Sequence, residues 1–313
     1  MGKTLKRAAV LAGLLAVAQA GGSAYFYRRT MRRSHAKVER TMKMAGTDWG
    51  QYMPLIQKRK EAMLAQPHED VYITSRDGLK LHGAYFPNGE GNKIVVCFHG
   101  YTSQGMNDYI GLSDYYFRNG YRMLLPDARA HGLSEGKYIG FGCLDRYDAL
   151  AWLDWVLEEC GNEVQILLHG TSMGGATVLM TGGLELPKQV KGIVSDCGFT
   201  SPKEVFTHAL HSMYHLPAFP MIQIADAVNR VLAGYGLDEC NAAREAARID
   251  VPTLLIHGSA DAFVPTAMCD EIYRNCHGAK KLIVEGAAHA ESYYKDREAY
   301  EKALDDFLGG IIK

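Results

Sequence analysis

The chain has 313 residues, of which 47% are hydrophobic and 22% are charged, and its formal net charge is -1. This length can bury a large core, and the near-neutral charge gives no reason to expect a nucleic-acid partner. The seven cysteines are odd in number and irregularly spaced, with neither a disulfide framework nor a zinc-binding CxxC pattern. We expect most of them to be small buried residues, which favours a reducing compartment.

The N-terminal segment, residues 1–27, contains an uncharged stretch from residue 8 to residue 27. Twenty helical residues span about 30 Å, the thickness of a bilayer core. We favour a single-pass membrane anchor, because the apolar run continues beyond Ala18-Gln19-Ala20, which otherwise fits the cleavage site of a secretory signal peptide. A basic cluster after the stretch favours a cytoplasmic location for the C-terminal domain; it consists of Arg28, Arg29, Arg32 and Arg33.

Residues 28–67 are charged and rich in methionine, with helical character and no strand pattern. We interpret them as a solvated helical connector next to the membrane. A large domain then occupies residues 68–313. It begins with two strand-like runs, 71–75 and 79–86, on either side of the turn sequence Arg76-Asp77-Gly78.

Strands and helices alternate along the rest of this domain. The helical patterns include 144–160 and 297–308. The apolar strand-like runs are 93–100, 121–129, 164–170, 190–197, 253–261 and 280–289. Such alternation predicts an α/β fold, with a mostly parallel central sheet covered by helices on both faces. Functional groups of this fold lie beyond the carboxyl ends of the strands.

Residues 201–247 interrupt the alternation, because they contain no clear strand and are helical and aromatic. We predict that this interval is a small helical cap. Five of its apolar residues are candidates for a substrate pocket, although such residues also serve simple packing: Phe206, Met213, Tyr214, Phe219 and Met221. Tyr214 and Phe219 are the cap residues that we predict to bind substrate.

The sequence Gly170-Thr171-Ser172-Met173-Gly174 follows the strand at 164–170 and precedes a helical pattern. Gly-x-Ser-x-Gly in this context is typical of a nucleophile elbow, a turn so tight that side chains at the two glycines would collide with nearby backbone. Ser172 is therefore the candidate nucleophile.

A serine hydroxyl needs a base, and that base needs a carboxylate. His289 follows the last strand on a loop of small residues, and Asp261 ends the preceding strand. Asp196, after an earlier strand, is an alternative to Asp261. Four other histidines have weaker claims: His99, His169 and His257 fall in or beside apolar runs, and His131 is expected to shape the site wall.

Two backbone N–H groups should stabilise the oxyanion of a tetrahedral intermediate. Met173, directly after the candidate nucleophile, supplies one, and Tyr101, after the strand at 93–100, supplies the other. The Tyr101 side chain is also predicted to line the substrate pocket.

Five stretches, FHGYTS, DARAHGLSEG, GTSMGG, GSADAFVP and GAAHA, occur in the order typical of one superfamily. From about residue 71 to residue 308 the chain resembles an α/β-hydrolase of the serine esterase, lipase and aminopeptidase type. It is similar to a bacterial branch with an N-terminal hydrophobic segment and a modest helical cap. The resemblance implies a serine nucleophile, an acyl-enzyme intermediate and no cofactor. The oxyanion loop lacks the HGGG pattern of another lipase group.

These features predict a serine hydrolase that cleaves carboxylic esters, with small to medium lipophilic esters as substrates. The same three side chains would also serve a peptidase, an amidase or a thioesterase, and a non-catalytic binding protein with this fold is a further alternative. Metal dependence is disfavoured, because the sequence has no HExxH motif or clustered ligand set.

Overall fold

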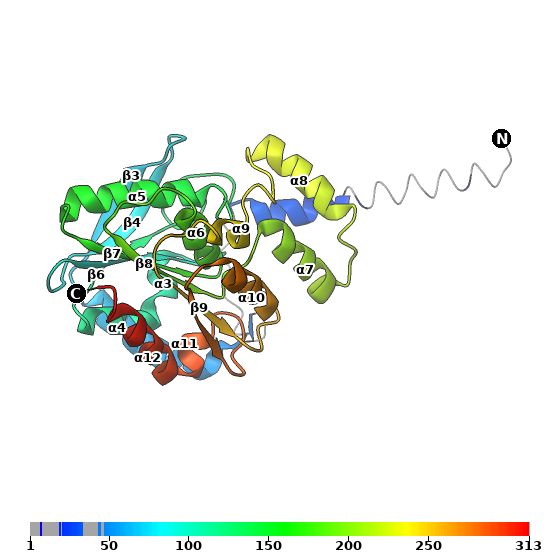
Figure 1. Cartoon of the computed structure of the whole chain (residues 1–313). Coiled ribbons are helices and arrows are strands. Elements are labelled where there is room, and N and C mark those ends of the chain that lie inside the picture. Colours follow the sequence, from blue (N-terminus) through cyan, green and yellow to red (C-terminus); the bar gives the residue numbers. More distant parts are fainter. Residues whose placement is uncertain (1–6, 8–18, 20, 34–42, 45–46, 313) are drawn as a thin grey trace.

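The computed structural model describes residues 7, 19, 21–33, 43–44 and 47–312. Its centre is an eight-stranded sheet with helices on both faces (Figure 1). The sheet order is β10-β9-β8-β7-β5-β6-β4-β3. The strands are β3 Glu69–Thr74, β4 Lys80–Phe86, β5 Lys93–Phe98, β6 Arg122–Pro126, β7 Gln165–Thr171, β8 Val190–Asp196, β9 Thr253–Gly258 and β10 Lys280–Val284.

Five neighbouring strand pairs, from β10 through to β6, are parallel. The two antiparallel pairs, β3 with β4 and β4 with β6, lie at one edge. Central strands are apolar on both sides because both sides are covered, and Val95 and Leu167 are fully buried. The predicted mostly parallel α/β sheet is confirmed.

The helices outside the cap form a layer on each face of the sheet. Trp152 on α5, Val178 on α6 and Cys269 on α10 belong to one apolar cluster. Tyr116 on α4 and Leu304 on α12 belong to the other. The bounds are α2 Met53–Leu64, α3 Gly105–Asp108, α4 Ile110–Arg118, α5 Asp145–Cys160, α6 Met173–Gly182, α10 Thr266–Asn275, α11 Ser292–Lys295 and α12 Arg297–Leu308.

Three helices occupy the interval that we predicted as a cap: α7 Pro202–Tyr214, α8 Met221–Leu232 and α9 Ala242–Ala246. Ser201 starts α7 as an N-cap, since its side chain accepts a hydrogen bond from the Glu204 N–H. The helices α7 and α8 project from the side of the sheet, whereas α9 packs back onto α6 (Figure 1).

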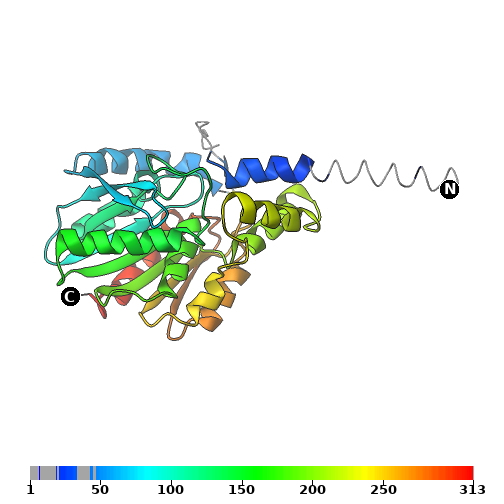
Figure 2. The ribbon, with the colours of Figure 1, turned by 90° about the horizontal axis from the view of Figure 1, so that it is seen from above.

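Residues 21–31 are helical and lie beside α7 and α8 in both views of the ribbon (Figures 1 and 2). The Tyr27 hydroxyl donates to Asn229 Oδ1 at 3.2 Å, and the rings of Phe26 and Tyr214 lie 4.9 Å apart. None of the helices described in the structure is both long and apolar enough to cross a membrane. Much of the predicted anchor, residues 8–18 and residue 20, lies outside the described residues.

The predicted connector differs from a simple solvated helix. It includes the helices η1 Trp49–Tyr52 and α2, but also a small antiparallel pair, β1 Lys43–Met44 with β2 Thr47–Asp48. Thr47 is buried, and its hydroxyl donates to the His289 carbonyl at 3.1 Å. The Tyr52 hydroxyl donates to Glu291 Oε1 at 2.6 Å. This stretch therefore packs against the loop that carries His289.

Candidate active site

Ser172 lies at the sharp turn between β7 and α6. Its φ of 55° is in the left-handed region, which costs a non-glycine residue about 1–3 kcal/mol. A Cβ at Gly174 would overlap the Phe98 carbonyl, and one at Gly170 would overlap the Gly174 carbonyl. The two glycines are thus required by close backbone contacts, as expected for the elbow.

Three side chains that are far apart in the sequence meet at this turn. Ser172 Oγ lies 2.8 Å from His289 Nε2, and His289 Nδ1 lies 2.7 Å from Asp261 Oδ2. Each of the three residues is only 6% exposed. The distances fit a serine hydroxyl that donates to an imidazole, which in turn donates to a carboxylate. This continuous chain of hydrogen bonds is the arrangement that nucleophilic catalysis by serine requires.

The Asp261 carboxylate is held from several directions. Oδ1 accepts hydrogen bonds from the N–H groups of Phe263 at 2.9 Å and Val264 at 2.8 Å. Burial alone would raise the pKa of Asp261, but the charge of His289 and hydrogen bonds from His257 and His289 hold it well below its usual value. Asp261 is therefore ionised beside the His289 ring and able to stabilise its cation.

His257 contacts Asp261, and the sequence did not predict this contact. Its Nε2 lies 2.8 Å from the Val264 carbonyl and 3.4 Å from Asp261 Oδ2. Burial disfavours the charged ring, yet hydrogen bonds to Asp261 and Cys269 raise the pKa of His257 to about 10. Its position four residues before Asp261 was the available signal, but a buried strand histidine usually has only a packing role.

Asp196, the alternative acid, also lies near Ser172, but its carboxylate bonds to a different residue. Its Oδ2 accepts a hydrogen bond from the Tyr300 hydroxyl at 3.1 Å, and its carbonyl accepts one from the Ser172 N–H at 2.8 Å. Burial raises the pKa of Asp196 to about 6. The structure thus pairs Asp261, rather than Asp196, with His289.

The loop after β5 lies against the elbow. A Cβ built on Gly100 would be 3.3 Å from Ser172 Cβ, and the Gly100 N–H donates to Asp108 Oδ2 at 2.6 Å. Within the part of the chain that the structure describes, the N–H groups of Tyr101 and Met173 have no hydrogen-bond partner in the protein. Both predicted oxyanion donors are therefore available. Asp108, which holds this loop, was not predicted.

The Tyr101 side chain connects the loop to the cap. Its ring lies 5.3 Å from Phe141, whose ring lies 4.9 Å from Phe206 on α7. The Tyr101 hydroxyl donates to the Arg29 carbonyl at 3.2 Å. Tyr214 instead packs on Phe26, and Phe219 is 73% exposed. Of the predicted cap residues, Phe206 is the one that joins the aromatic row from Tyr101.

His99 and His131 hydrogen-bond to loops near the site, and His169 lies in the core. The Thr102 N–H donates to His131 Nε2 at 3.3 Å, which places His131 at the site wall as predicted. The Ala128 N–H donates to His99 Nε2 at 2.9 Å. His169 lies between the hydroxyls of Tyr116 and Tyr300, and burial lowers its pKa to about 3. These three rings are buried and hydrogen-bonded, which agrees with their weaker claims to a catalytic role.

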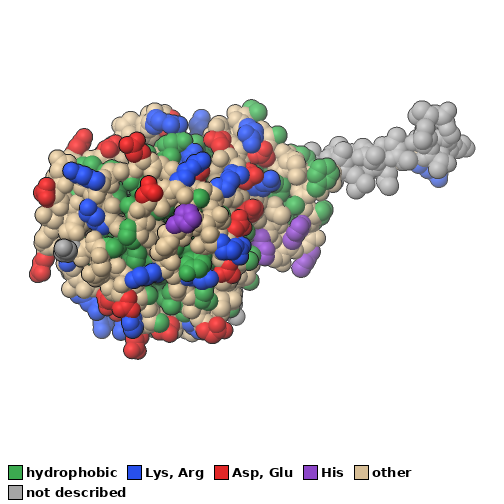
Figure 3. All heavy atoms as spheres, viewed as in Figure 1, with side chains coloured by type: hydrophobic (Ala, Val, Ile, Leu, Met, Phe, Trp, Pro, Cys, Tyr) green, Lys and Arg blue, Asp and Glu red, His purple; other side chains and the backbone are tan. Residues whose placement is uncertain are grey.

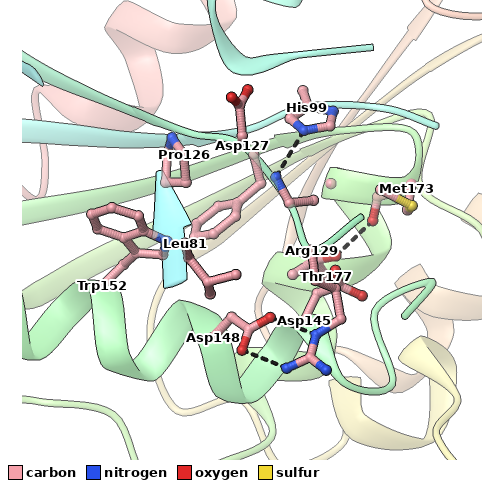
Figure 4. Close-up of a pocket in the computed structure, with 13 residues that line it drawn as sticks. Leu81, His99, Pro126, Asp127, Arg129, Asp145, Asp148, Trp152, Met173 and Thr177 are labelled. Carbon is pink, nitrogen blue, oxygen red and sulfur yellow. Dashed lines mark hydrogen bonds and ion pairs between the residues drawn. The ribbon is translucent and has the colours of Figure 1, made fainter. Parts of the chain in front are cut away.

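A cavity of about 10 Å³ lies next to Met173 (Figure 4). Figure 4 shows the Arg129 guanidinium paired with Asp148 at its border, and Arg129 Nε lies 2.7 Å from Asp148 Oδ2. This volume holds about one water molecule, so the cavity is not the substrate pocket.

Cys197 lies beside the hydrogen-bonded chain. Its Sγ and the donor atoms of Asp261 and His289 all lie within 4.8 Å of one another, a spacing that could hold a metal ion. Burial raises the pKa of the Cys197 thiol well above its ordinary value. A metal ligand must lose its proton, so the three residues are a poor cation site.

Comparison with known proteins assigns the family. Residues 93–231 match the family described as alpha/beta hydrolase fold, and residues 238–310 match TAP-like proteins. An uncharacterized Bacillus subtilis protein, YqkD, is 30% identical over 243 residues, which cover 76% of this chain and 78% of YqkD. The chain belongs to the α/β-hydrolase family.

Solved structures agree with this fold. An esterase from Pyrococcus furiosus, Pf2001, aligns with a TM-score of 0.67 and 24% identity, over 80% of this chain and 94% of the esterase. A shorter match, 33% identical over 87 residues, is to a pimeloyl-[acyl-carrier protein] methyl ester esterase from Neisseria meningitidis; it covers 28% of this chain and 25% of that enzyme. The chain is thus a hydrolase-fold protein whose solved structural neighbours include esterases.

Proposed function

We propose that this protein is a serine hydrolase that cleaves carboxylic esters through an acyl-enzyme intermediate. The observation that carries the proposal is the unbroken contact from Ser172 Oγ to His289 Nε2, at 2.8 Å, and from His289 Nδ1 to Asp261 Oδ2, at 2.7 Å. A binding protein has no need of this chain of hydrogen bonds. The esterases among the structural neighbours support the same reaction class.

In the proposed mechanism, Ser172 attacks the ester carbonyl while His289 Nε2 takes its proton. Asp261 stabilises the resulting imidazolium, and the N–H groups of Met173 and Tyr101 stabilise the oxyanion. His289 then protonates the departing alcohol, which leaves an acyl group on Ser172. Water deprotonated by His289 hydrolyses this acyl-enzyme and restores the serine.

Substitution of the nucleophile tests the proposal. Ser172→Ala should lower kcat for p-nitrophenyl butyrate by about 10⁶-fold, as for other serine nucleophiles. Ser113→Ala, at a buried serine on α4, is the matched control and should keep full activity. Equal turnover by the Ser172→Ala variant and the control would refute the proposed nucleophile.

We propose lipophilic acyl chains as the substrate class, on the basis of the aromatic row of Tyr101, Phe141 and Phe206. Measured kcat/KM should increase from acetate to longer p-nitrophenyl esters. Phe206→Ala should reduce this increase more than it reduces hydrolysis of the acetate. Activity confined to short, polar esters would contradict the assignment.

We also propose, from the sequence, that residues 8–27 anchor the chain in a membrane with the hydrolase domain on the cytoplasmic side. The uncharged stretch and the arginines that follow it support this location. External protease applied to intact cells should then leave the hydrolase domain uncut. Digestion from outside, or an intact mass lacking the first 20 residues, would contradict it.

A further inference from the structure

Two uncharged stretches of sequence come together on the cap side of the molecule. Residues 205–225 contain no Asp, Glu, Lys or Arg, and neither do residues 8–27. The ring contact between Phe26 and Tyr214, at 4.9 Å, joins the described end of one stretch to the other. The hydrogen bond from Tyr27 to Asn229 also holds residues 21–31 against α8.

Large apolar side chains are exposed on this surface. Phe219 is 73% exposed and Val231 is 82% exposed, more than any other large hydrophobic residue in the described part of the chain. We call this set the cap surface: Tyr25, Met213, Tyr214, Phe219, Val231 and Leu232. Figure 3 shows hydrophobic and histidine side chains, with few charged ones, at this end of the molecule. A patch of this kind usually marks an interaction site.

Basic residues lie at the border of the cap surface. Arg28, Arg29 and Arg32 are exposed on or next to the helix of residues 21–31, and Arg230 is exposed on α8. Arg230 forms an ion pair with Asp226, so the three N-terminal arginines supply most of the positive charge. An apolar surface with a cationic border matches the interface of a bilayer that carries anionic lipids.

We propose that the cap surface inserts into the interfacial region of a membrane with anionic lipids. The contact involves α7, α8 and the helix of residues 21–31, whose residues 21–27 form the end of the proposed anchor. Burial of these side chains in the acyl boundary supplies the attraction, and the arginines add contacts with headgroup phosphates. This membrane contact is independent of the proposed catalytic role of Ser172.

The test measures the environment of the cap surface in the full chain, bound to vesicles of equal parts phosphatidylcholine and phosphatidylglycerol. Phe219→Cys and Val231→Cys each carry an NBD fluorophore, and the exposed β3 position Tyr72→Cys carries the same label as the control. The unsubstituted chain, labelled in parallel, gives the background from native cysteines. Because both cap positions are highly exposed, substitution there should not disturb folding.

On binding to vesicles, the labels at positions 219 and 231 should shift their emission to shorter wavelength, and doxyl-labelled lipid should quench their fluorescence. The label at position 72 should do neither. Both cap signals should weaken in phosphatidylcholine alone, which offers no anionic headgroups. The proposal is wrong if the emission of both cap labels on the vesicle-bound chain shows an aqueous environment, as that of the label at position 72 should.

A second copy of the chain is the alternative occupant of the surface. In that case the chain should sediment as a dimer that Phe219→Ser dissociates, and doxyl-labelled lipid should not quench the cap labels. This combined result would show that the surface is a dimer interface, and it would refute the membrane contact. Hydrolysis of a water-soluble ester by the same labelled variants, measured without vesicles, keeps this result distinct from a failure of the proposed function.

Discussion

At the scale of single residues, two buried aspartates near Ser172 have opposite electrostatic properties. Asp261 accepts two backbone N–H groups and contacts two histidines, which favours its ionised form. Asp196 accepts from the Tyr300 hydroxyl, and burial raises its pKa. An imidazolium on His289 needs an anion beside it, so Asp261 is the residue suited to the role.

Amide substitution should separate the two aspartates by activity. Asp261→Asn keeps the shape but favours the wrong tautomer of His289, so kcat should fall by about 10⁴-fold. Asp196→Asn should retain most of the activity, because its side chain does not contact His289 Nδ1. Steady-state kinetics on p-nitrophenyl butyrate gives the comparison, and a larger loss in Asp196→Asn would reverse the assignment.

The same Asp196→Asn variant should change how the free energy of unfolding depends on pH. Because the pKa of Asp196 is raised from 3.8 to about 6, folding favours its protonated form, and this contribution to stability is lost as pH rises from about 4 to 6. Relative to the parent, the variant should gain up to about 3 kcal/mol in unfolding free energy across this window. Urea unfolding from pH 4 to pH 7 measures it, and a constant difference would contradict the shift.

The sequence was sufficient to predict Ser172, Asp261 and His289 as partners, because each follows a strand of a parallel sheet and such strands end at one edge. It did not predict the contact of His257 with Asp261 or that of Asp108 with the Gly100 N–H. Their contacts depend on how loops fold back after β9 and β5, and neither periodicity nor spacing encodes that geometry.

At the scale of secondary-structure elements, the helix of residues 21–31 and α8 are joined through Asn229. This fully buried amide accepts from the Tyr27 hydroxyl and donates to the Tyr235 carbonyl at 2.8 Å. Removal of the amide would leave two buried polar groups without their partner, which costs about 1–3 kcal/mol for each. The contact between the two helices should therefore depend on this residue.

Asn229→Ala should loosen the N-terminal helix from the cap. Trypsin should then cut faster after Arg28 and Arg29, whose side chains are exposed. Gln223→Ala, at an exposed position on the same helix α8, is the matched control and should leave the cleavage rate unchanged. Equal rates for the two variants would mean that Asn229 does not hold the helix.

Sequence patterns predicted the long elements better than the short or docked ones. The buried runs of β5 and β7 and the helix α5 are strongly apolar or periodic, so they were placed within a few residues. The two-residue strands β1 and β2 are too short to leave a pattern. Packing of residues 21–31 on the cap was missed, because an uncharged stretch gives the same signal for a membrane and for a protein surface.

At the scale of the whole molecule, the cap and the N-terminal helix lie side by side at one side of the sheet (Figures 1 and 2). Tyr101 links the loop after β5 to both of them. Tyr101 contacts Arg29 through its hydroxyl and reaches Phe206 through Phe141, while its backbone is a candidate oxyanion donor. The proposed membrane contact and the proposed substrate pocket therefore share neighbouring elements. This arrangement is suited to an ester that reaches Ser172 from a lipid phase.

The central claim is that Ser172 is an activated nucleophile. A fluorophosphonate probe, followed by peptide mass spectrometry of the folded full chain, tests it most directly. We predict a single phosphonylated serine at position 172, lost in Ser172→Ala and strongly slowed in Asp261→Asn. An unlabelled Ser172 in folded protein, or equal labelling in Asp261→Asn, would contradict the account.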